Sequence, residues 1–132
     1  MKRDPELIRS VLLFFEKKDS FEIVEAGSLN VEGYEDKAIE YHLMLMAQAG
    51  LVDCEAFRSK SNPERLIRVM PFNLTWKGHE YLDGVRDSSV WKKAVKSSKG
   101  KTGDFIFDVA FAIGRQTVRA AAKKVTGLDL DL

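Results

Sequence analysis

The chain has 132 residues, and its 21 Lys and Arg nearly balance its 20 Asp and Glu, which leaves a formal net charge of +1. A hydrophobic fraction of 45% with so little net charge excludes a wholly disordered chain. No stretch of about 20 apolar residues is free of charge, which excludes a membrane-spanning protein. We expect no membrane partner, and the C-terminal helix on a membrane surface is a minor alternative. This length fits one domain, or a small domain with an appendage.

The first predicted element is a helix over residues 5–18. Asp4 is a favourable N-cap, and Pro5 follows at the first helical position, where its missing N–H costs nothing. Large apolar side chains then recur at spacings of three and four residues, which gives the helix one apolar face. Residues 19–34 are less regular, and their composition allows a short strand or a second short helix, followed by a loop.

A second helix is predicted over residues 35–49, and Gly50 supplies its C-terminal stop. His42 lies on the apolar stripe of this helix. We interpret it as a buried, hydrogen-bonded histidine rather than as a ligand or a catalytic base.

A β-hairpin follows this helix. Leu51 begins its first strand, and the polar stretch 58–64, with its Asn-Pro turn, forms the tip. Residues 65–70 are the returning strand, and Pro71 is predicted to end it.

Thr75 is the expected N-cap of a third helix that extends to about residue 86. Residues 93–103 are rich in Lys, Ser and Gly and are predicted to form a basic flexible linker. A C-terminal amphipathic helix, capped by Asp104, is predicted within residues 104–132.

This order of elements predicts an α+β fold that is mostly α. A helix whose glycine stop leads directly into a basic hairpin is typical of the winged helix-turn-helix arrangement, in which the hairpin is the wing. We therefore expect a winged helix-turn-helix core over residues 1–92 with a C-terminal helical extension.

Several short motifs are similar to those of a family of small uncharacterised bacterial and phage proteins, a catalogued domain of unknown function. They cover roughly residues 1–92, and the remaining residues match only as a helical tail. The resemblance implies a winged-helix fold and a phage or prophage context, and it carries no known catalytic or binding residues. The motifs include Met1-Lys2-Arg3-Asp4, Gly33-Tyr34, Ile39-x-Tyr41-His42-Leu43 and Leu74-Thr75-Trp76-x-Gly78-His79-Glu80. The glycine of the last motif is expected to allow close helix packing.

The function expected first is duplex DNA binding by a transcriptional regulator, with the second helix in the major groove. Bases would be contacted from this helix and phosphates from the hairpin and the lysines that follow the third helix. The expected DNA-binding residues are Lys37, Tyr41, Arg58, Lys60, Arg65, Arg68, Lys92 and Lys93.

The alternative is a protein-interaction module without DNA binding, since several exposed positions of the second helix are acidic. The charged hairpin then protects a solvated strand edge from pairing with other chains. Charge is also uneven along the chain. Residues 1–87 hold 12 Lys and Arg against 16 Asp and Glu, a net of −4, and residues 88–132 hold 9 against 4, a net of +5.

The apolar stripe of the C-terminal helix requires a partner. A homodimer through this helix is one expectation, because two-fold DNA binders need a dimer interface. Otherwise the helix folds back on the core of its own chain, or its partner is an unknown protein. The residues expected at the dimer contact are Phe105, Ile106, Val109 and Ile113.

No catalytic constellation is found in the sequence. The two histidines show no metal-ligand spacing, and Gly100-Lys101-Thr102-Gly103 lacks the first glycine of a phosphate-binding loop. We therefore expect neither an enzyme nor a cofactor. The single Cys54 is interpreted as a strand residue rather than a nucleophile, and one cysteine without a partner favours a reducing compartment, the cytoplasm.

Overall fold

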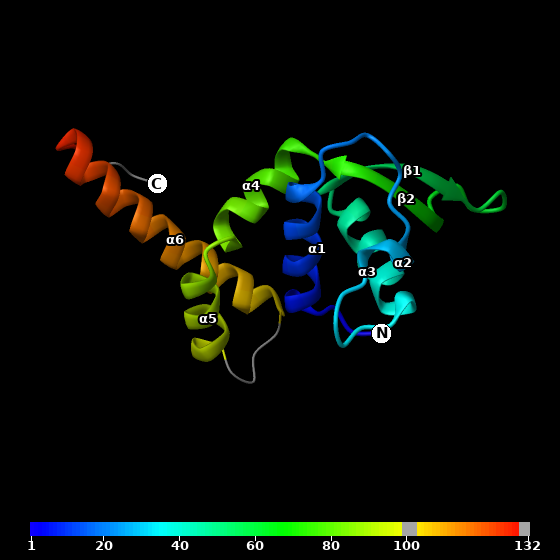
Figure 1. Cartoon of the computed structure of the whole chain (residues 1–132), viewed down its shortest axis with the longest axis horizontal. Coiled ribbons are helices and arrows are strands. Elements are labelled where there is room, and N and C mark those ends of the chain that lie inside the picture. Colours follow the sequence, from blue (N-terminus) through cyan, green and yellow to red (C-terminus); the bar gives the residue numbers. More distant parts are fainter. Residues whose placement is uncertain (99–102, 130–132) are drawn as a thin grey trace. The chain divides into compact units, whose positions relative to one another are not determined.

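The computed structural model describes residues 1–98 and 103–129 (Figure 1). The chain divides into two compact units, Met1–Leu82 and Asp83–Leu132, which are called the N-terminal and the C-terminal unit below. The division lies before the boundary expected at residue 92. The elements are α1 (Pro5–Lys17), α2 (Ala26–Leu29), α3 (Asp36–Gln48), β1 (Val52–Arg58), β2 (Leu66–Leu74), α4 (Trp76–Val85), α5 (Ser88–Ser97) and α6 (Gly103–Thr126).

The fold is α+β and mostly helical, as the sequence predicts. Its sheet, within the described residues, is the antiparallel pair of β1 and β2. In the N-terminal unit, α1 and α3 face each other with their apolar stripes, which supply most of the core. Fully burying one such side chain stabilises the fold by about 1.5–3 kcal/mol. The buried residues of these two helices include Leu7, Val11, Leu12, Ile39, Leu43 and Met46.

The start of α1 forms as predicted. The Asp4 side chain accepts hydrogen bonds from the backbone N–H groups of Glu6 and Leu7, and Pro5 occupies the first helical position. These bonds satisfy two of the donors that a helix N-terminus otherwise leaves without partners.

The irregular segment between α1 and α3 contains the short helix α2, one of the two structures expected there. Before α2 the chain runs extended beside β2, and the backbone N–H of Val24 donates to the carbonyl of Pro71 at 2.9 Å. β2 therefore has β1 on one side and this extended segment on the other.

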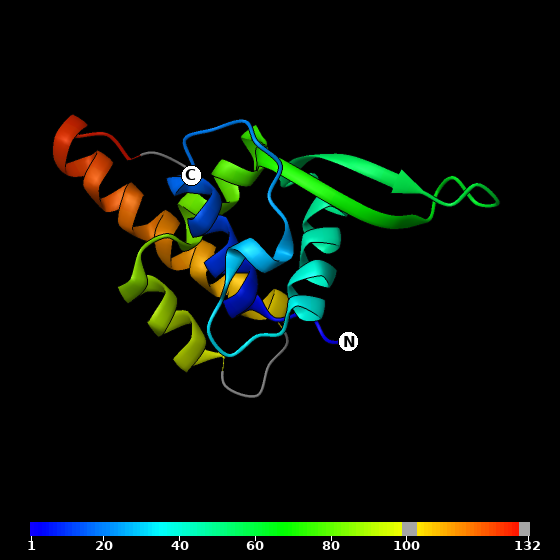
Figure 2. The same cartoon turned by 45° about the vertical axis from the view of Figure 1, so that its right-hand side comes forward.

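The hairpin extends beyond the helices of its own unit, as Figure 2 shows. Its register pairs Val52 with Leu74 at the base and Arg58 with Leu66 near the tip. The prediction that Pro71 ends the returning strand is wrong, because β2 continues to Leu74. A register shift beside Cys54 accommodates the proline, which has no N–H to offer the ladder.

The base of the hairpin is joined to the start of α4. Thr75 caps α4 by accepting from the Gly78 N–H at 3.0 Å, and its own backbone N–H donates to the Leu51 carbonyl at 3.0 Å. Gly78 lies directly against that carbonyl, since a Cβ placed on it would be only 2.1 Å from the oxygen. Because Gly78 has no Cβ, α4 can approach the Leu51 carbonyl closely, which is the role expected of this glycine.

The C-terminal unit packs α5 against the first half of α6. Trp91 and Phe107 lie with their ring centroids 5.3 Å apart, and Phe107 stacks near Phe111 at 6.3 Å. Phe111 in turn covers Gly84, where an added Cβ would be 2.0 Å from the ring. These contacts form the small aromatic core of the unit.

The linker predicted over residues 93–103 is wrong in its first part, because α5 continues to Ser97. Asp87 caps this helix, and burial of Trp91 and Ala94 holds it, while its lysines remain on the exposed face. Residues 99–102 of the predicted linker lie outside the described residues. The last helix begins at Gly103, one residue before the cap expected at Asp104.

Candidate nucleic-acid interface

The outer face of α3 carries the two residues expected to meet bases. Lys37 is exposed, and Tyr41 is half-buried with its ring edge-on to His42 at 5.7 Å. Glu40 and Met44 lie on the same face, so the carboxylate of Glu40 offsets the positive charge of Lys37. This face alone therefore offers little attraction to a polyanion.

A polar cluster of Asp4, Tyr34 and His42 positions α3 against α1. His42 is 2% exposed, its Nδ1 lies 2.7 Å from the Ala38 carbonyl, and its Nε2 accepts from the Asp4 backbone N–H at 2.7 Å. These roles assign the ring proton to Nδ1. The buried, hydrogen-bonded histidine predicted from the sequence is confirmed.

Tyr34 completes this cluster. Its hydroxyl donates to the Asp4 carboxylate at 2.7 Å. Burial, and next the hydrogen bond to Asp4, raise the pKa of Tyr34 to about 12. Sequence reasoning did not identify the partner of His42 across the fold. The signal was present all the same, since all three residues lie in motifs of the resemblance described above.

The four cations of the hairpin fall into two groups. Arg58 donates from Nη1 to the carbonyls of Pro63 and Glu64 at 3.2 and 3.4 Å and so holds the tip closed. Arg68 forms an exposed ion pair with Glu25 at 3.8 Å.

Lys60 and Arg65 form the second group. Both side chains are exposed at the tip, and no hydrogen bond or ion pair with another described residue engages either of them. The hairpin thus presents two uncommitted cations to solvent.

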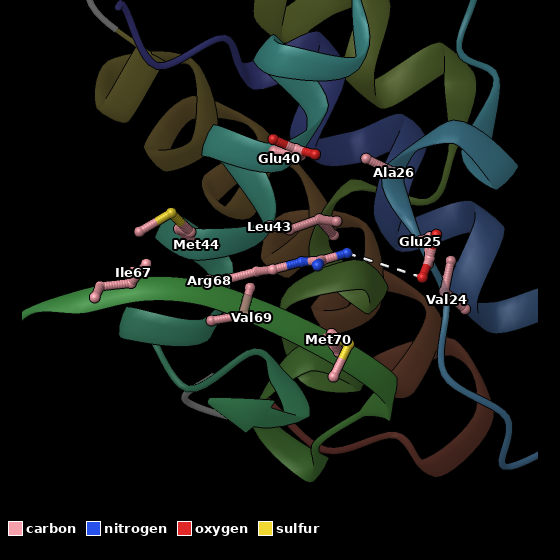
Figure 3. A pocket seen from close by; sticks show the side chains of 10 residues that line it. All are labelled: Val24, Glu25, Ala26, Glu40, Leu43, Met44, Ile67, Arg68, Val69 and Met70. Atoms are coloured by element: carbon pink, nitrogen blue, oxygen red, sulfur yellow. Dashed lines mark ion pairs between the residues drawn. The ribbon is translucent and has the colours of Figure 1, made fainter. Parts of the chain in front are cut away.

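A groove lies between α3, β2 and the segment before α2 (Figure 3). Its cavity volume of about 50 Å³ is far below the roughly 300–1,000 Å³ of small-molecule sites, so it cannot enclose a nucleotide or a cofactor. Figure 3 shows the Arg68 side chain extended toward Glu25. The lining residues are Val24, Glu25, Ala26, Glu40, Leu43, Met44, Ile67, Arg68, Val69 and Met70.

The remaining predicted contacts belong to the C-terminal unit. Lys92 and Lys93 are exposed on α5 in that unit, whereas Lys37, Tyr41 and the hairpin cations belong to the N-terminal unit.

On α6, sequence reasoning missed Phe107, which packs near Trp91, and Phe111, which stacks near Phe107. Their spacing of four residues was the available signal. The four residues predicted at a dimer contact are at least partly exposed, and Phe105 is 42% exposed.

No group of three or more His, Cys, Asp or Glu among the described residues could hold a metal ion. Burial raises the pKa of the half-buried Cys54 thiol in β1, which agrees with a strand residue. None of the described helices combines the length and the hydropathy needed to cross a membrane.

Comparison with known proteins places most of the chain in one family. Residues 2–104 match the family model described as "Hypothetical protein (DUF2513)". An uncharacterized protein of Haemophilus influenzae is 33% identical over 111 residues, which cover 82% of this chain and 87% of that relative. No solved structure matches the chain. Neither of the two descriptions contains an activity.

Proposed function

This chain belongs to the DUF2513 family, and we propose that its N-terminal unit is a winged helix-turn-helix that binds duplex DNA as a transcriptional regulator, without catalysis. The order of its elements supports this proposal. α1 is followed by an extended segment that bonds to β2, then by α2 and α3, and then by the hairpin. In a winged helix the same order places the helix before the hairpin in the major groove and the hairpin beside it.

The observation that carries the proposal is the pair of uncommitted cations, Lys60 and Arg65, at the end of a hairpin whose tip Arg58 holds closed. Cations that release counterions from phosphates supply most of the non-specific affinity for DNA. Basic side chains on a narrow projection also suit the minor groove. The hairpin is therefore the main source of attraction within this unit.

The face of α3 contributes selectivity rather than attraction. Lys37 and Tyr41 are accessible to bases, while Glu40 repels phosphates but can accept a hydrogen bond from the amino group of cytosine. A module of this kind binds weakly to random DNA and discriminates through few contacts.

The test compares the unaltered full chain with the K60Q/R65Q variant on a random-sequence duplex, by fluorescence polarisation over a range of salt concentrations. Loss of two phosphate contacts makes the slope of log affinity against log salt about 1.8 units shallower. The matched control is K17Q/K77Q, which removes the same charge from exposed positions on α1 and α4. Absence of binding at low salt would sink the proposal, because phosphate contacts are strongest there.

A second candidate function is a protein-interaction module, which the groove between α3 and β2 favours. Its floor includes Leu43 and Val69, and the carboxylates of Glu25 and Glu40 line it. These features fit a peptide that inserts one aliphatic side chain and places a Lys or Arg beside Glu40. A peptide of that kind should bind the unaltered chain and not the E25K/E40K variant. If this second function is the correct one, added duplex DNA should not change the affinity for the peptide.

The proposal includes a two-fold dimer through α6, as expected of a protein that binds paired half-sites. Phe105 and its neighbours Ile106, Val109 and Ile113 would meet their counterparts in a second copy. Sedimentation of the full chain tests this part, with the F105Q/V109Q variant predicted to shift the mass to that of one chain.

A further inference from the structure

The second half of α6, residues 115–126, is the most exposed helical segment of the C-terminal unit. The ring contact between α5 and α6 joins Trp91 to Phe107, and Phe111 stacks near Phe107, so both of these α6 rings lie in the first half of the helix. From Arg115 to Thr126 every side chain whose exposure is described is exposed, except that of the half-buried Ala122. Val118 is 56% and Val125 is 85% exposed. This half of the helix is therefore open to a partner.

The charge of this segment is of one sign. Four cations, Arg115, Arg119, Lys123 and Lys124, lie between the carboxylates of Asp108 and Asp129, and no acidic residue stands between those two positions. Lys123 is paired with Asp129 at 3.3 Å, but both side chains are largely exposed, and such an exposed pair contributes little stability. A phosphate group can replace that carboxylate at little cost.

Three of the cations form a stripe. Arg115, Arg119 and Lys123 recur every four residues, so they lie on one side of the helix at steps of about 6 Å along its axis. Lys124 points about 100° away from Lys123 around that axis. A straight row of evenly spaced cations suits a ligand with regularly repeated anionic groups.

The face beside this stripe argues against a lipid surface. It holds Val118 and Val125 with several alanines, and it lacks the Trp, Phe or Leu with which amphipathic helices enter a bilayer. The side chains therefore fit a row of phosphates better than a lipid surface.

We propose that Arg115, Arg119 and Lys123 form a second, sequence-independent contact with the phosphates of duplex DNA. This inference rests on the proposed function and adds a separate site on the C-terminal unit. Contacts with phosphates carry no sequence information, so this stripe adds affinity without changing the choice of sequence.

The experiment measures binding of the full chain to two unrelated duplexes over a range of salt concentrations. The R115Q/R119Q/K123Q variant loses up to three phosphate contacts, so the slope of log affinity against log salt becomes about 2.7 units shallower. Gln is a good helix former, and circular dichroism confirms that α6 persists. The ratio of affinities for the two duplexes stays the same.

Two control variants test the stripe itself. R115K/R119K keeps the charges and is expected to keep the slope, since phosphates are held here by charge. K124Q removes a cation outside the stripe and is expected to change the slope much less than R119Q does.

The outcomes separate this inference from the proposed function. An unchanged slope in the triple variant, together with a shallower slope in K60Q/R65Q, overturns the stripe and leaves the hairpin as the contact. A shallower slope in the triple variant supports the stripe, whatever the hairpin variant shows. If anionic vesicles capture the unaltered chain but not the triple variant, and the salt slope on DNA is the same for both, the stripe is overturned as a DNA contact in favour of a membrane. Absence of any DNA binding at low salt overturns both proposals.

Discussion

The two units hold their helices together by different means. In the N-terminal unit a buried histidine accepts from a backbone N–H far along the chain, and Gly78 lies directly against the Leu51 carbonyl. In the C-terminal unit a few aromatic rings hold α5 to α6, and half of α6 is left exposed. The first unit carries a net charge of −3 and the second +4. We infer that the first is specified by precise contacts and the second by charge on a simple scaffold.

The largest effect is expected from Gly78→Ala. The new Cβ would overlap the Leu51 carbonyl. Because the Cβ is fixed to the α4 backbone and the carbonyl is itself backbone, neither can move aside easily, so we expect a loss of about 3 kcal/mol of unfolding free energy. Denaturant unfolding of the full chain measures it. The matched control is Gly27→Ala, whose Cβ would make an ordinary 3.6 Å contact with Asp36. Equal stability of the two variants would contradict the precise contact.

His42→Phe comes next. The phenyl ring fills the site but leaves the part-buried Asp4 N–H without its acceptor, which costs about 2 kcal/mol. Thermal unfolding followed by circular dichroism measures the loss. The exposed His79 supplies the control, and His79→Phe is expected to change stability by less than about 0.5 kcal/mol.

Gly84→Ala tests the C-terminal unit in the same way. The Phe111 ring lies where the Cβ would be, but a side chain can turn aside more easily than backbone, so we expect a smaller loss of about 1.5 kcal/mol. In a W76F background, the emission of the buried Trp91 reports on this unit. A loss as large as that of Gly78→Ala would break the contrast between the units.

Tyr34→Phe is expected to cost about 1 kcal/mol at neutral pH through the lost bond to Asp4. The folded-state pKa of Tyr34 is raised to about 12, above the ordinary value of 10.0 for a tyrosine. Folding therefore favours the protonated phenol, and this contribution is complete below pH 10 and is lost as pH rises toward 12. Stability measured across that range should fall less in Tyr34→Phe than in the unaltered chain.

The smallest effect concerns DNA. Glu25→Gln removes the ion-pair partner of Arg68 and one carboxylate near the hairpin, so DNA affinity is expected to rise about threefold, in line with the modest strength of exposed pairs. Glu22→Gln, in the same extended segment, is the control. Unchanged affinity in Glu25→Gln, measured at low salt, would show that Arg68 does not meet phosphates.

The local features of the fold were predictable from the sequence. The Asp4-Pro5 start of α1, the glycine stop of α3 and the Thr75 cap of α4 each rest on the chemistry of one or two neighbouring residues. The same holds for the hairpin with its polar tip. These signals act over a few positions, so the sequence displays them directly.

The errors have a common cause in contacts between distant residues. Pro71 stays in β2 because its carbonyl meets Val24 and a register shift relieves its missing N–H. Lys93 lies in a helix rather than a linker because Trp91 is buried by Phe107, which is remote in sequence. At the candidate interface, the sequence shows four hairpin cations without distinguishing them. In the structure, Arg58 and Arg68 have partners within the protein, whereas the side chains of Lys60 and Arg65 remain available to a ligand.

The bond between Asp4 and His42 also bears on the order of events during synthesis. The chain is made from its N-terminus, and the acceptor of the Asp4 N–H lies 38 residues later. α1 therefore exists before the residue that fixes it has been added. The base of the hairpin closes later still, when Thr75 can reach Gly50. All of these partners lie within the first 82 residues, so the contacts that complete the N-terminal unit require no residue of α6.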